Sequence, residues 1–354
     1  MLAADSKVMS APTADSLNPE PAGSWKQIID PVEPFLEAVA GRLASQVEAF
    51  DPALAGYADY ALNGQGKHLR PALVALSANA LGGAGDDHVT VAVIIETVHL
   101  ATLIHDDVMD EAEIRRGRLT LAANWGNDVA VLFGDCLFAH ALKLAASFPS
   151  PDICRAVASA TQTVCSGEIL QTQRRCDLHL TREQYFKILE MKTGELFALS
   201  CELSARLCEA TPELRQSLRQ FGLALGTAYQ VYDDCVDLFG SEAVAGKSLG
   251  TDLATGKLTL PVLLLRDSAD RADRERLVKL LQDRAPGALP QIAPLLAQYG
   301  TLAASVDIIH QYLAKACQAI EALPASEGRV GLFGLCHYLA RQTDALCSAP
   351  GAGL

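Results

Sequence analysis

The sequence has few aromatic residues and no run of lysine and arginine. Aromatic side chains make up 6% of its 354 residues, and the formal net charge is −13 at pH 7. Because nucleic-acid backbones attract basic stripes, a chain without them is not expected to bind nucleic acid. No stretch reaches the roughly 18 apolar residues that span a bilayer, and the N-terminus lacks the apolar core of a signal peptide. We therefore expect a cytoplasmic protein without a transmembrane segment.

The sequence also lacks cysteine patterns of the kind that bind zinc. Ten cysteines are present, but none forms a C-x-x-C pair or follows the Cys/His spacing of a zinc site. This absence favours free thiols in a reducing compartment.

What the sequence does have is a strong helical pattern. Half of its residues are apolar, and alanine and leucine, which favour helices, dominate the chain. We expect residues 1–24, rich in Ser, Pro, Ala and Asp, to be a mobile tail, and residues 25–354 to form one all-α domain. Helices are predicted at about 31–50, 70–81, 88–111, 126–147, 151–173, 181–208 and 211–240, with shorter ones up to about 347.

Two D-D-x-x-D segments stand at the ends of long apolar stretches, and they read DDVMD and DDCVD. Residues four apart lie on the same helix face, so each segment can grip one ion. The pairs are Asp106 with Asp110, and Asp233 with Asp237. Carboxylate oxygens suit Mg²⁺, which typically takes one or two carboxylates together with water and substrate phosphates. Two such pairs predict a phosphate-bearing ligand held between metal ions.

These acids could instead be solvated helix ends, and a single segment would carry little weight. Basic residues near both segments favour the functional interpretation. Arg115 and Arg116 follow the first segment, and Lys247 and Lys257 lie in a turn-rich loop after the second. Arginine forks and lysine ammonium groups match phosphate oxygens, so the expected ligand is a diphosphate.

Five motifs, in order, resemble those of the trans-isoprenyl diphosphate synthases, the polyprenyl synthetase family. They are GKHLRP, HDDVMDEAEIRRG, KTGEL, AYQVYDDCVD and GKSLGTDLATGKLTLP. The resemblance extends from about Gly66 to the C-terminus. It implies a single large all-α bundle around a central cavity, the isoprenoid synthase type I fold, in a chain that is usually a homodimer.

The resemblance also implies a role for each matching residue. The Mg²⁺ ligands would be Asp106, Asp110 and Asp233, with three ions per active site when substrate is bound. The catalytic set would also include Asp107, Lys192, Asp234 and Asp237. The allylic diphosphate would contact Arg115, Lys192, Thr193, Gln230, Lys247 and Lys257. In a neighbouring pocket, the diphosphate of isopentenyl diphosphate would contact Lys67, Arg70, His99 and Arg116.

The implied reaction is a head-to-tail condensation. Diphosphate is a poor leaving group until cations neutralise the charge that develops as the carbon–oxygen bond breaks. The double bond of isopentenyl diphosphate attacks the resulting allylic carbocation, a proton is lost, and the chain grows by one five-carbon unit. An apolar cavity must keep water away from the carbocation.

The residues beneath the first acidic motif predict a medium- or long-chain product. Ala101 and Thr102 lie about one helical turn below Asp106, where a growing tail would run, and Val98 lies one turn further down. Relatives that stop at fifteen or twenty carbons tend to have bulky aromatic residues at the first two positions. Small residues leave the shaft open, unless an aromatic ring from another helix forms its floor, for which the candidates are Phe133 and Phe138.

Several neighbouring residues receive more modest interpretations. We expect His68 to be exposed and His105 to be structural. Glu168 and Gln171 either line the cavity or face the dimer partner. Gly194 would permit close packing between helices, because glycine lets two backbones approach each other.

Three alternatives remain open at this point. The chain could be a farnesyl or geranylgeranyl diphosphate synthase, with the same chemistry and a shorter product. It could catalyse terpene cyclisation or head-to-head condensation, although those reactions do not need the GKHLRP element and the RRG pair together. It could also be a non-catalytic partner subunit of a heteromeric synthase, although such subunits typically lose acids from one motif.

Overall fold

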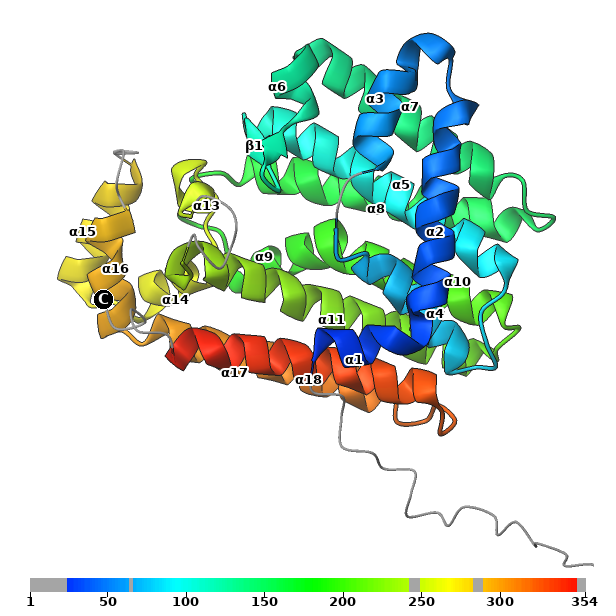
Figure 1. Cartoon of the computed structure of the whole chain (residues 1–354). Helices are drawn as coiled ribbons and strands as arrows, with labels where there is room; N and C mark the ends of the chain where they lie inside the picture. The colour runs from blue at the N-terminus through cyan, green and yellow to red at the C-terminus, as the bar shows by residue number, and fades with distance from the viewer. Residues whose placement is uncertain (1–23, 64–65, 242–248, 283–288, 349–354) are drawn as a thin grey trace, which may run out of the picture.

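The structure is a computed structural model, and it describes residues 24–63, 66–241, 249–282 and 289–348. Lys247 lies outside these residues, and so does the expected tail apart from Ser24. The described elements are almost all helices, as predicted (Figure 1). The one sheet among them is a short antiparallel hairpin of β1 (Ile114–Arg115) and β2 (Arg118–Leu119). The sequence pattern did not predict this hairpin.

The first part of the chain carries the first acidic motif. Helical structure begins at Trp25, earlier than the expected Pro31, because Ser24 and Gln27 form a capping box. The helices of this part are α1 (Trp25–Ile29), α2 (Glu33–Ser45), α3 (Ala55–Leu62), α4 (Leu69–Asn79), α5 (Asp86–Met109), α6 (Leu121–Trp125), α7 (Asn127–Ala145) and α8 (Pro151–Gln173), with short 3₁₀ turns η2 (Asp30–Val32), η3 (Gln46–Ala49) and η4 (Pro52–Leu54).

The second part carries the KTGEL motif and the second acidic motif. The single helix expected at 181–208 is interrupted by a π-helical turn, η5 (Glu190–Gly194). The helices are α9 (Arg182–Leu189), α10 (Glu195–Leu207), α11 (Pro212–Phe239), α13 (Thr251–Ala254), α14 (Leu260–Ser268), α15 (Arg271–Gln282), α16 (Leu289–Gln298), α17 (Thr301–Ala319) and α18 (Glu327–Ser348).

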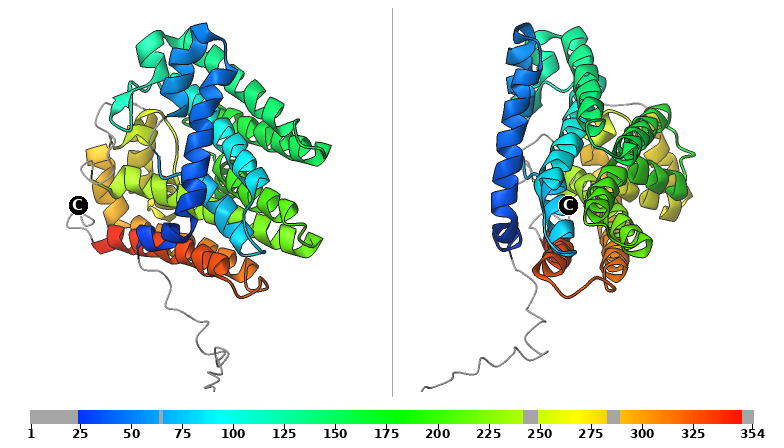
Figure 2. Two further views of the ribbon diagram at one scale, coloured as in Figure 1. Left: turned by 45° about the vertical axis from the view of Figure 1, so that its right-hand side comes forward. Right: turned by 90° about the vertical axis from the view of Figure 1, so that its right-hand side faces the viewer.

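Helix α5 is the central element of the bundle. It packs against α7, α4, α10 and α2, and α2 runs along its outer side (Figure 2). By length and composition α5 could cross a membrane, but 67% of its apolar stretch is buried inside the bundle. We therefore interpret α5 as a core helix whose C-terminal end carries the first acidic motif.

Glycine allows the helices around the site to approach closely. A Cβ atom at Gly226 of α11 would lie 2.9 Å from the Cα atom of Gly194. The expected close packing at Gly194 is therefore confirmed. This contact holds the end of the π turn against the helix that carries the second acidic motif.

His105, next to the first acidic motif, joins α5 to α7. Its Nε2 atom lies 3.0 Å from the carbonyl oxygen of Val131, and its ring packs against Gly134, where a Cβ atom would collide with it. The expected structural role of His105 is confirmed.

Candidate active site

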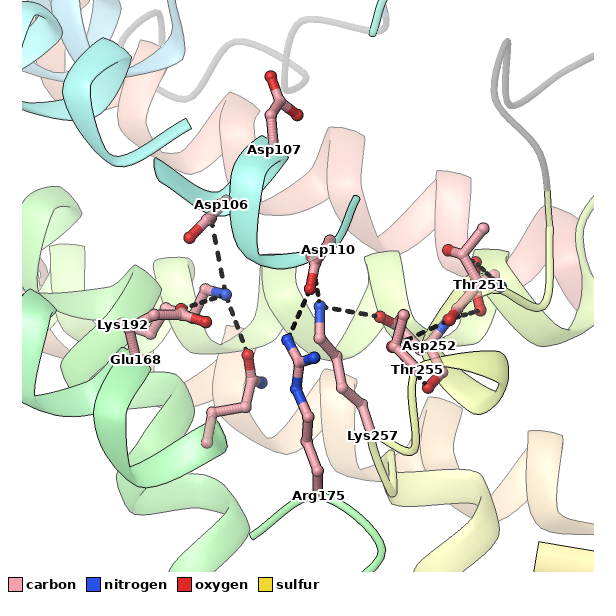
Figure 3. Close-up of polar contacts among 12 residues, drawn as sticks. Asp106, Asp107, Asp110, Glu168, Arg175, Lys192, Thr251, Asp252, Thr255 and Lys257 are labelled. Carbon is pink, nitrogen blue, oxygen red and sulfur yellow. Dashed lines mark hydrogen bonds and ion pairs between the residues drawn. The ribbon is translucent and has the colours of Figure 1, made fainter. Parts of the chain in front are cut away.

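The three acids of the first motif point in two directions from the end of α5. Asp106 and Asp110 face the same side of the helix, while Asp107 points away from both (Figure 3). Asp107 is buried and accepts a hydrogen bond of 2.6 Å from Arg115 Nε. The spacing argument holds for Asp106 and Asp110, which share a helix face.

Two cations converge on Asp110. Arg175 Nη2 lies 2.7 Å from one carboxylate oxygen and Lys257 Nζ lies 2.7 Å from the other. Lys257 also lies 3.7 Å from Asp252. The sequence reasoning missed Arg175, although the Arg174–Arg175 pair at the end of α8 was a possible signal.

Lys192 is the cation beside Asp106, just as Arg175 and Lys257 are the cations beside Asp110. Its Nζ atom lies 3.6 Å from Asp106 Oδ2, donates to Gln171 Oε1 at 3.0 Å, and forms an ion pair with Glu168. Lys192 stands in the π turn, and such turns inside helices are frequent at functional sites. Of the two interpretations of Glu168 and Gln171, the structure supports the one in which they line the site.

Burial and charge set the protonation of these groups. Burial raises the pKa of Asp106 to about 6, although nearby Lys192 lowers it. Burial alone would raise the pKa of Asp110 too, but the hydrogen bond and charge of Lys257 outweigh it, so this pKa is lowered. Burial depresses the Lys192 pKa less than Asp106 and Glu168 raise it, so this pKa lies above its usual value. The lysine is therefore charged.

The second acidic motif is held by a chain of hydrogen bonds. Thr193 Oγ1 donates to Gln230 Oε1 at 2.9 Å, and Gln230 Nε2 donates to Asp234 Oδ1 at 2.9 Å. The hydroxyl of Tyr185, which the sequence reasoning missed, donates to Asp234 Oδ2 at 2.5 Å. Burial, together with the charge of Asp252, raises the pKa of Asp234 to about 8. A cation beside this acid would favour its charged form and lower the pKa.

The last acid of the second motif, Asp237, faces a different element. It is fully buried and accepts hydrogen bonds from Thr251 Oγ1 at 3.0 Å and from the backbone N–H of Asp252 at 3.2 Å. These bonds hold the start of α13. Asp237 thereby positions the segment that leads to Lys257, whereas Asp233 of the same motif is only half-buried.

A pocket of about 60 Å³ lies where these segments meet. Residues from three motifs line it, and the predicted ones are Lys192, Gln230, Asp234 and Lys257. Three segments far apart in the sequence thus bring their charged side chains to one cavity.

The residues expected to bind isopentenyl diphosphate come from the start of α4, from α5 and from the turn between β1 and β2. The guanidinium of Arg116 approaches Gly66 so closely that a Cβ atom there would lie 2.6 Å from Arg116 Nη1. Arg70 lies over the ring of Phe197 at 5.1 Å, and Lys67 is exposed. Burial, with the charge of Arg70, lowers the pKa of His99 well below its usual value, so its ring is neutral.

Arg115 does not join the cluster around Lys192 in this structure. Together with Asp107, Arg116 and Arg118 it lines a separate pocket of about 300 Å³ on the other face of α5. Its assignment to the allylic diphosphate stays a prediction.

His68 is half-buried, whereas an exposed side chain was expected. Its side chain is 28% exposed, and its Nδ1 atom lies 3.6 Å from Glu96 Oε1. The reason is its backbone, whose φ of 45° and ψ of 43° place it in the left-handed region. This turn directs the ring towards α5.

Two of the three residues expected to control chain length are packed in the core, and Thr102 is half-buried. Ala101 and Val98 are at most 1% exposed, and Phe133 belongs to the same apolar cluster. The hydroxyl of Thr102 donates to the carbonyl of His99 at 2.7 Å. Because Phe133 shares this cluster, both interpretations of the floor stay predictions.

The pair of Asp106 and Asp110 fits Mg²⁺ better than a metal held by protein alone. Within the described residues, no group of three or more His, Cys, Asp or Glu side chains is arranged to hold a metal ion. Mg²⁺ commonly takes one or two carboxylates and completes its shell with water and substrate phosphates. Asp106 and Asp110, on one helix face, offer such a pair.

Comparison with known proteins agrees with this arrangement of motifs. The sequence profile described as polyprenyl synthetase matches residues 51–296. The chain belongs to the polyprenyl synthetase family. Its membership, with the helical bundle described above, confirms the fold expected from the sequence.

Members of the polyprenyl synthetase family with known names resemble this chain over most of its length. Octaprenyl diphosphate synthase of Escherichia coli is 34% identical over 309 residues, which are 87% of this chain and 94% of that protein. The crystal structure of a decaprenyl diphosphate synthase from Rhodobacter capsulatus superposes with a TM-score of 0.84 at 30% identity, covering 90% and 99% of the two chains. A polyprenyl synthase from Caulobacter crescentus, solved with calcium and isoprenyl diphosphate, also reaches 0.84 at 32% identity and covers 91% and 99%.

Proposed function

We propose that this enzyme condenses an allylic diphosphate head-to-tail with isopentenyl diphosphate and releases a medium- or long-chain all-trans polyprenyl diphosphate. The observation that carries the proposal is the meeting of Lys192, Arg175 and Lys257 at the two acids on one face of α5. Acids and cations interleaved in this way suit a metal-bound polyanion, because each phosphate oxygen can find a partner. The names of the relatives support the chemistry and the chain length.

The cations have a defined task in the first step. As the carbon–oxygen bond of the allylic diphosphate breaks, negative charge collects on the departing diphosphate. Lys192 and Lys257 can stabilise this charge, since both are already gathered at the pocket. Asp106, Asp110 and Asp233 would hold three Mg²⁺ ions per site, which would supply further positive charge beside the leaving group.

The second step requires that the two substrates are oriented and that water is excluded from the allylic cation. No side chain has to act as a nucleophile. The double bond of isopentenyl diphosphate forms a carbon–carbon bond to the allylic cation, and the proton then lost passes to the departed diphosphate. Lys67, Arg70, His99 and Arg116 would hold isopentenyl diphosphate beside the cation. The apolar side of α5 would exclude water from it.

We infer that two copies of the chain associate through α7 and α8. These helices expose large apolar side chains, with Val131 40%, Leu132 65% and Ile169 58% exposed. Burying such side chains in an interface between copies is favourable.

We also place the dimer in the cytoplasm. The ten cysteines are free thiols in the structure, as expected in a reducing compartment.

The product profile of the purified chain tests this proposal directly. The chain alone is incubated with Mg²⁺, labelled isopentenyl diphosphate and farnesyl diphosphate, and products are separated by length. Products of thirty or more carbons are expected. A product of twenty carbons would identify a geranylgeranyl diphosphate synthase, and no extension from any primer would identify a partner subunit.

A further inference from the structure

Besides Asp107, helix α5 carries a second buried acid, Glu96, which lies away from the aspartate motifs. Glu96 is only 5% exposed, and it stands three residues before His99. Burying a carboxylate is costly unless charges or hydrogen bonds compensate. Its surroundings therefore indicate what it does.

The partners of Glu96 come from the GKHLRP segment at the start of α4. His68 Nδ1 lies 3.6 Å from Glu96 Oε1, too long for a hydrogen bond but close enough for an ion pair if the ring is protonated. Glu96 Oε2, His68 Nδ1 and Arg70 Nε are all buried without a hydrogen-bond partner among the described residues. Three such atoms at one place are unusual, because buried polar atoms are normally satisfied.

The charge of Glu96 is nevertheless maintained. Burial would raise its pKa, but the neighbouring basic residues, among them the buried Arg70, outweigh burial and lower the pKa to about 2. Glu96 is thus a carboxylate at neutral pH. It is the negative group among the basic residues of this pocket.

The backbone of His68 also requires support. Its φ of 45° lies in the left-handed region, which residues with a Cβ atom rarely adopt. Such conformations persist where the surrounding structure holds them, and they cluster at ligand sites. The ring of His68 lies against α5, with its Nδ1 atom 3.6 Å from Glu96 Oε1.

We propose that Glu96 is a positioning residue for isopentenyl diphosphate. By holding His68 in its left-handed turn, it fixes the path of the chain from Lys67 to Arg70 and so presents both cations to the diphosphate. This inference rests on the proposed function. Glu96 itself does not touch the substrate, because a carboxylate would repel diphosphate.

The test compares Glu96→Gln with a matched control on the same helix. Asp86→Asn removes an acid at the start of α5, where Asp86 is exposed and pairs with Arg42 at 2.6 Å. Binding of isopentenyl diphosphate is measured by calorimetry, and steady-state kinetics give KM for each substrate. Glu96→Gln should weaken binding and raise KM for isopentenyl diphosphate about tenfold, as expected for loss of an interaction with a charged group.

Other constants distinguish positioning from a merely structural role. The KM for the allylic substrate and the kcat of Glu96→Gln should stay within about twofold of the wild type, and Asp86→Asn should change none of them. His68→Gln should weaken binding similarly. In the double variant the two effects should not add, because they act through one contact.

The outcomes separate this inference from the proposed function. If the wild type binds isopentenyl diphosphate and turns over, but Glu96→Gln matches it or weakens both substrates equally, the positioning role is overturned. A lower melting temperature with unchanged constants would also overturn it, since Glu96 would then only stabilise the fold. A wild type that neither binds isopentenyl diphosphate nor turns over would overturn both the proposed function and the inference.

Discussion

Lys257 Nζ lies 2.7 Å from Asp110 Oδ2, although 147 residues separate the two in the sequence. The contact joins the end of α5 to the segment after α13, and Arg175 joins the same carboxylate to the segment after α8. Three distant parts of the chain therefore meet at one acid.

Replacing Lys257 by methionine should impair ionisation of the allylic substrate. The variant keeps the length of the side chain but removes a charge that stabilises the departing diphosphate. We expect kcat to fall about 10²- to 10³-fold, measured by steady-state kinetics. Lys279→Met, at an exposed position of α15, is the control, and equal constants for the two variants would remove Lys257 from the site.

Replacing Asp106 and replacing Asp107 should have very different effects on turnover, although the two residues are neighbours. Asp106→Asn removes a carboxylate that faces the site, and turnover should fall by about three orders of magnitude or more. Asp107→Asn changes an acid that points away and binds Arg115, so the loss should be about tenfold at most. Kinetics over a range of Mg²⁺ concentrations measure both, and equal losses would contradict the assignment of Asp106 to the metal.

Ala101→Phe should shorten the product. The ring would enter the space one turn below Asp106 and form a floor there. Ala101 is fully buried, so overpacking should also cost about 1–3 kcal/mol of stability. Ala145→Phe, equally buried but on α7, controls for that cost. Chromatography measures the length of the products, and an unchanged product length would assign the floor to other residues.

Affinity for Mg²⁺ in the absence of substrate should depend on pH. Asp106 has a pKa of about 6, so below pH 6 its protonated form predominates and competes with the metal. Affinity should therefore be full above pH 7 and fall about tenfold per pH unit below 6. Calorimetric titrations between pH 8 and pH 5 measure this change. Asp106→Asn should remove the dependence, and a dependence that survives in this variant would assign it to another acid.

The sequence predicted the structural features that depend on local patterns of residues. Apolar periodicity predicted the long helices, and i, i+4 spacing placed Asp106 and Asp110 on one face. The π turn at Lys192 escaped prediction, because one extra residue in a turn leaves no mark on the apolar pattern. It is held by close packing of Gly194 on Gly226, which only the tertiary structure shows.

Contacts between distant segments were the least predictable part of the site. Tyr185 and Arg175 bind acids 49 and 65 residues away, and no spacing rule connects them. The resemblance predicts an exposed His68, at a position where relatives often have lysine or arginine. Its left-handed backbone reverses this expectation by turning the ring inward.

The ion pairs at Asp106 and Asp110 also affect how strongly salt should influence the enzyme. Lys192, Arg175 and Lys257 already have carboxylate counterions supplied by the protein. When diphosphate arrives, these cations exchange one anionic partner for another, and few ions are released to the solvent. Substrate affinity should therefore change little with ionic strength, in contrast to an open basic surface that must shed its counterions on binding.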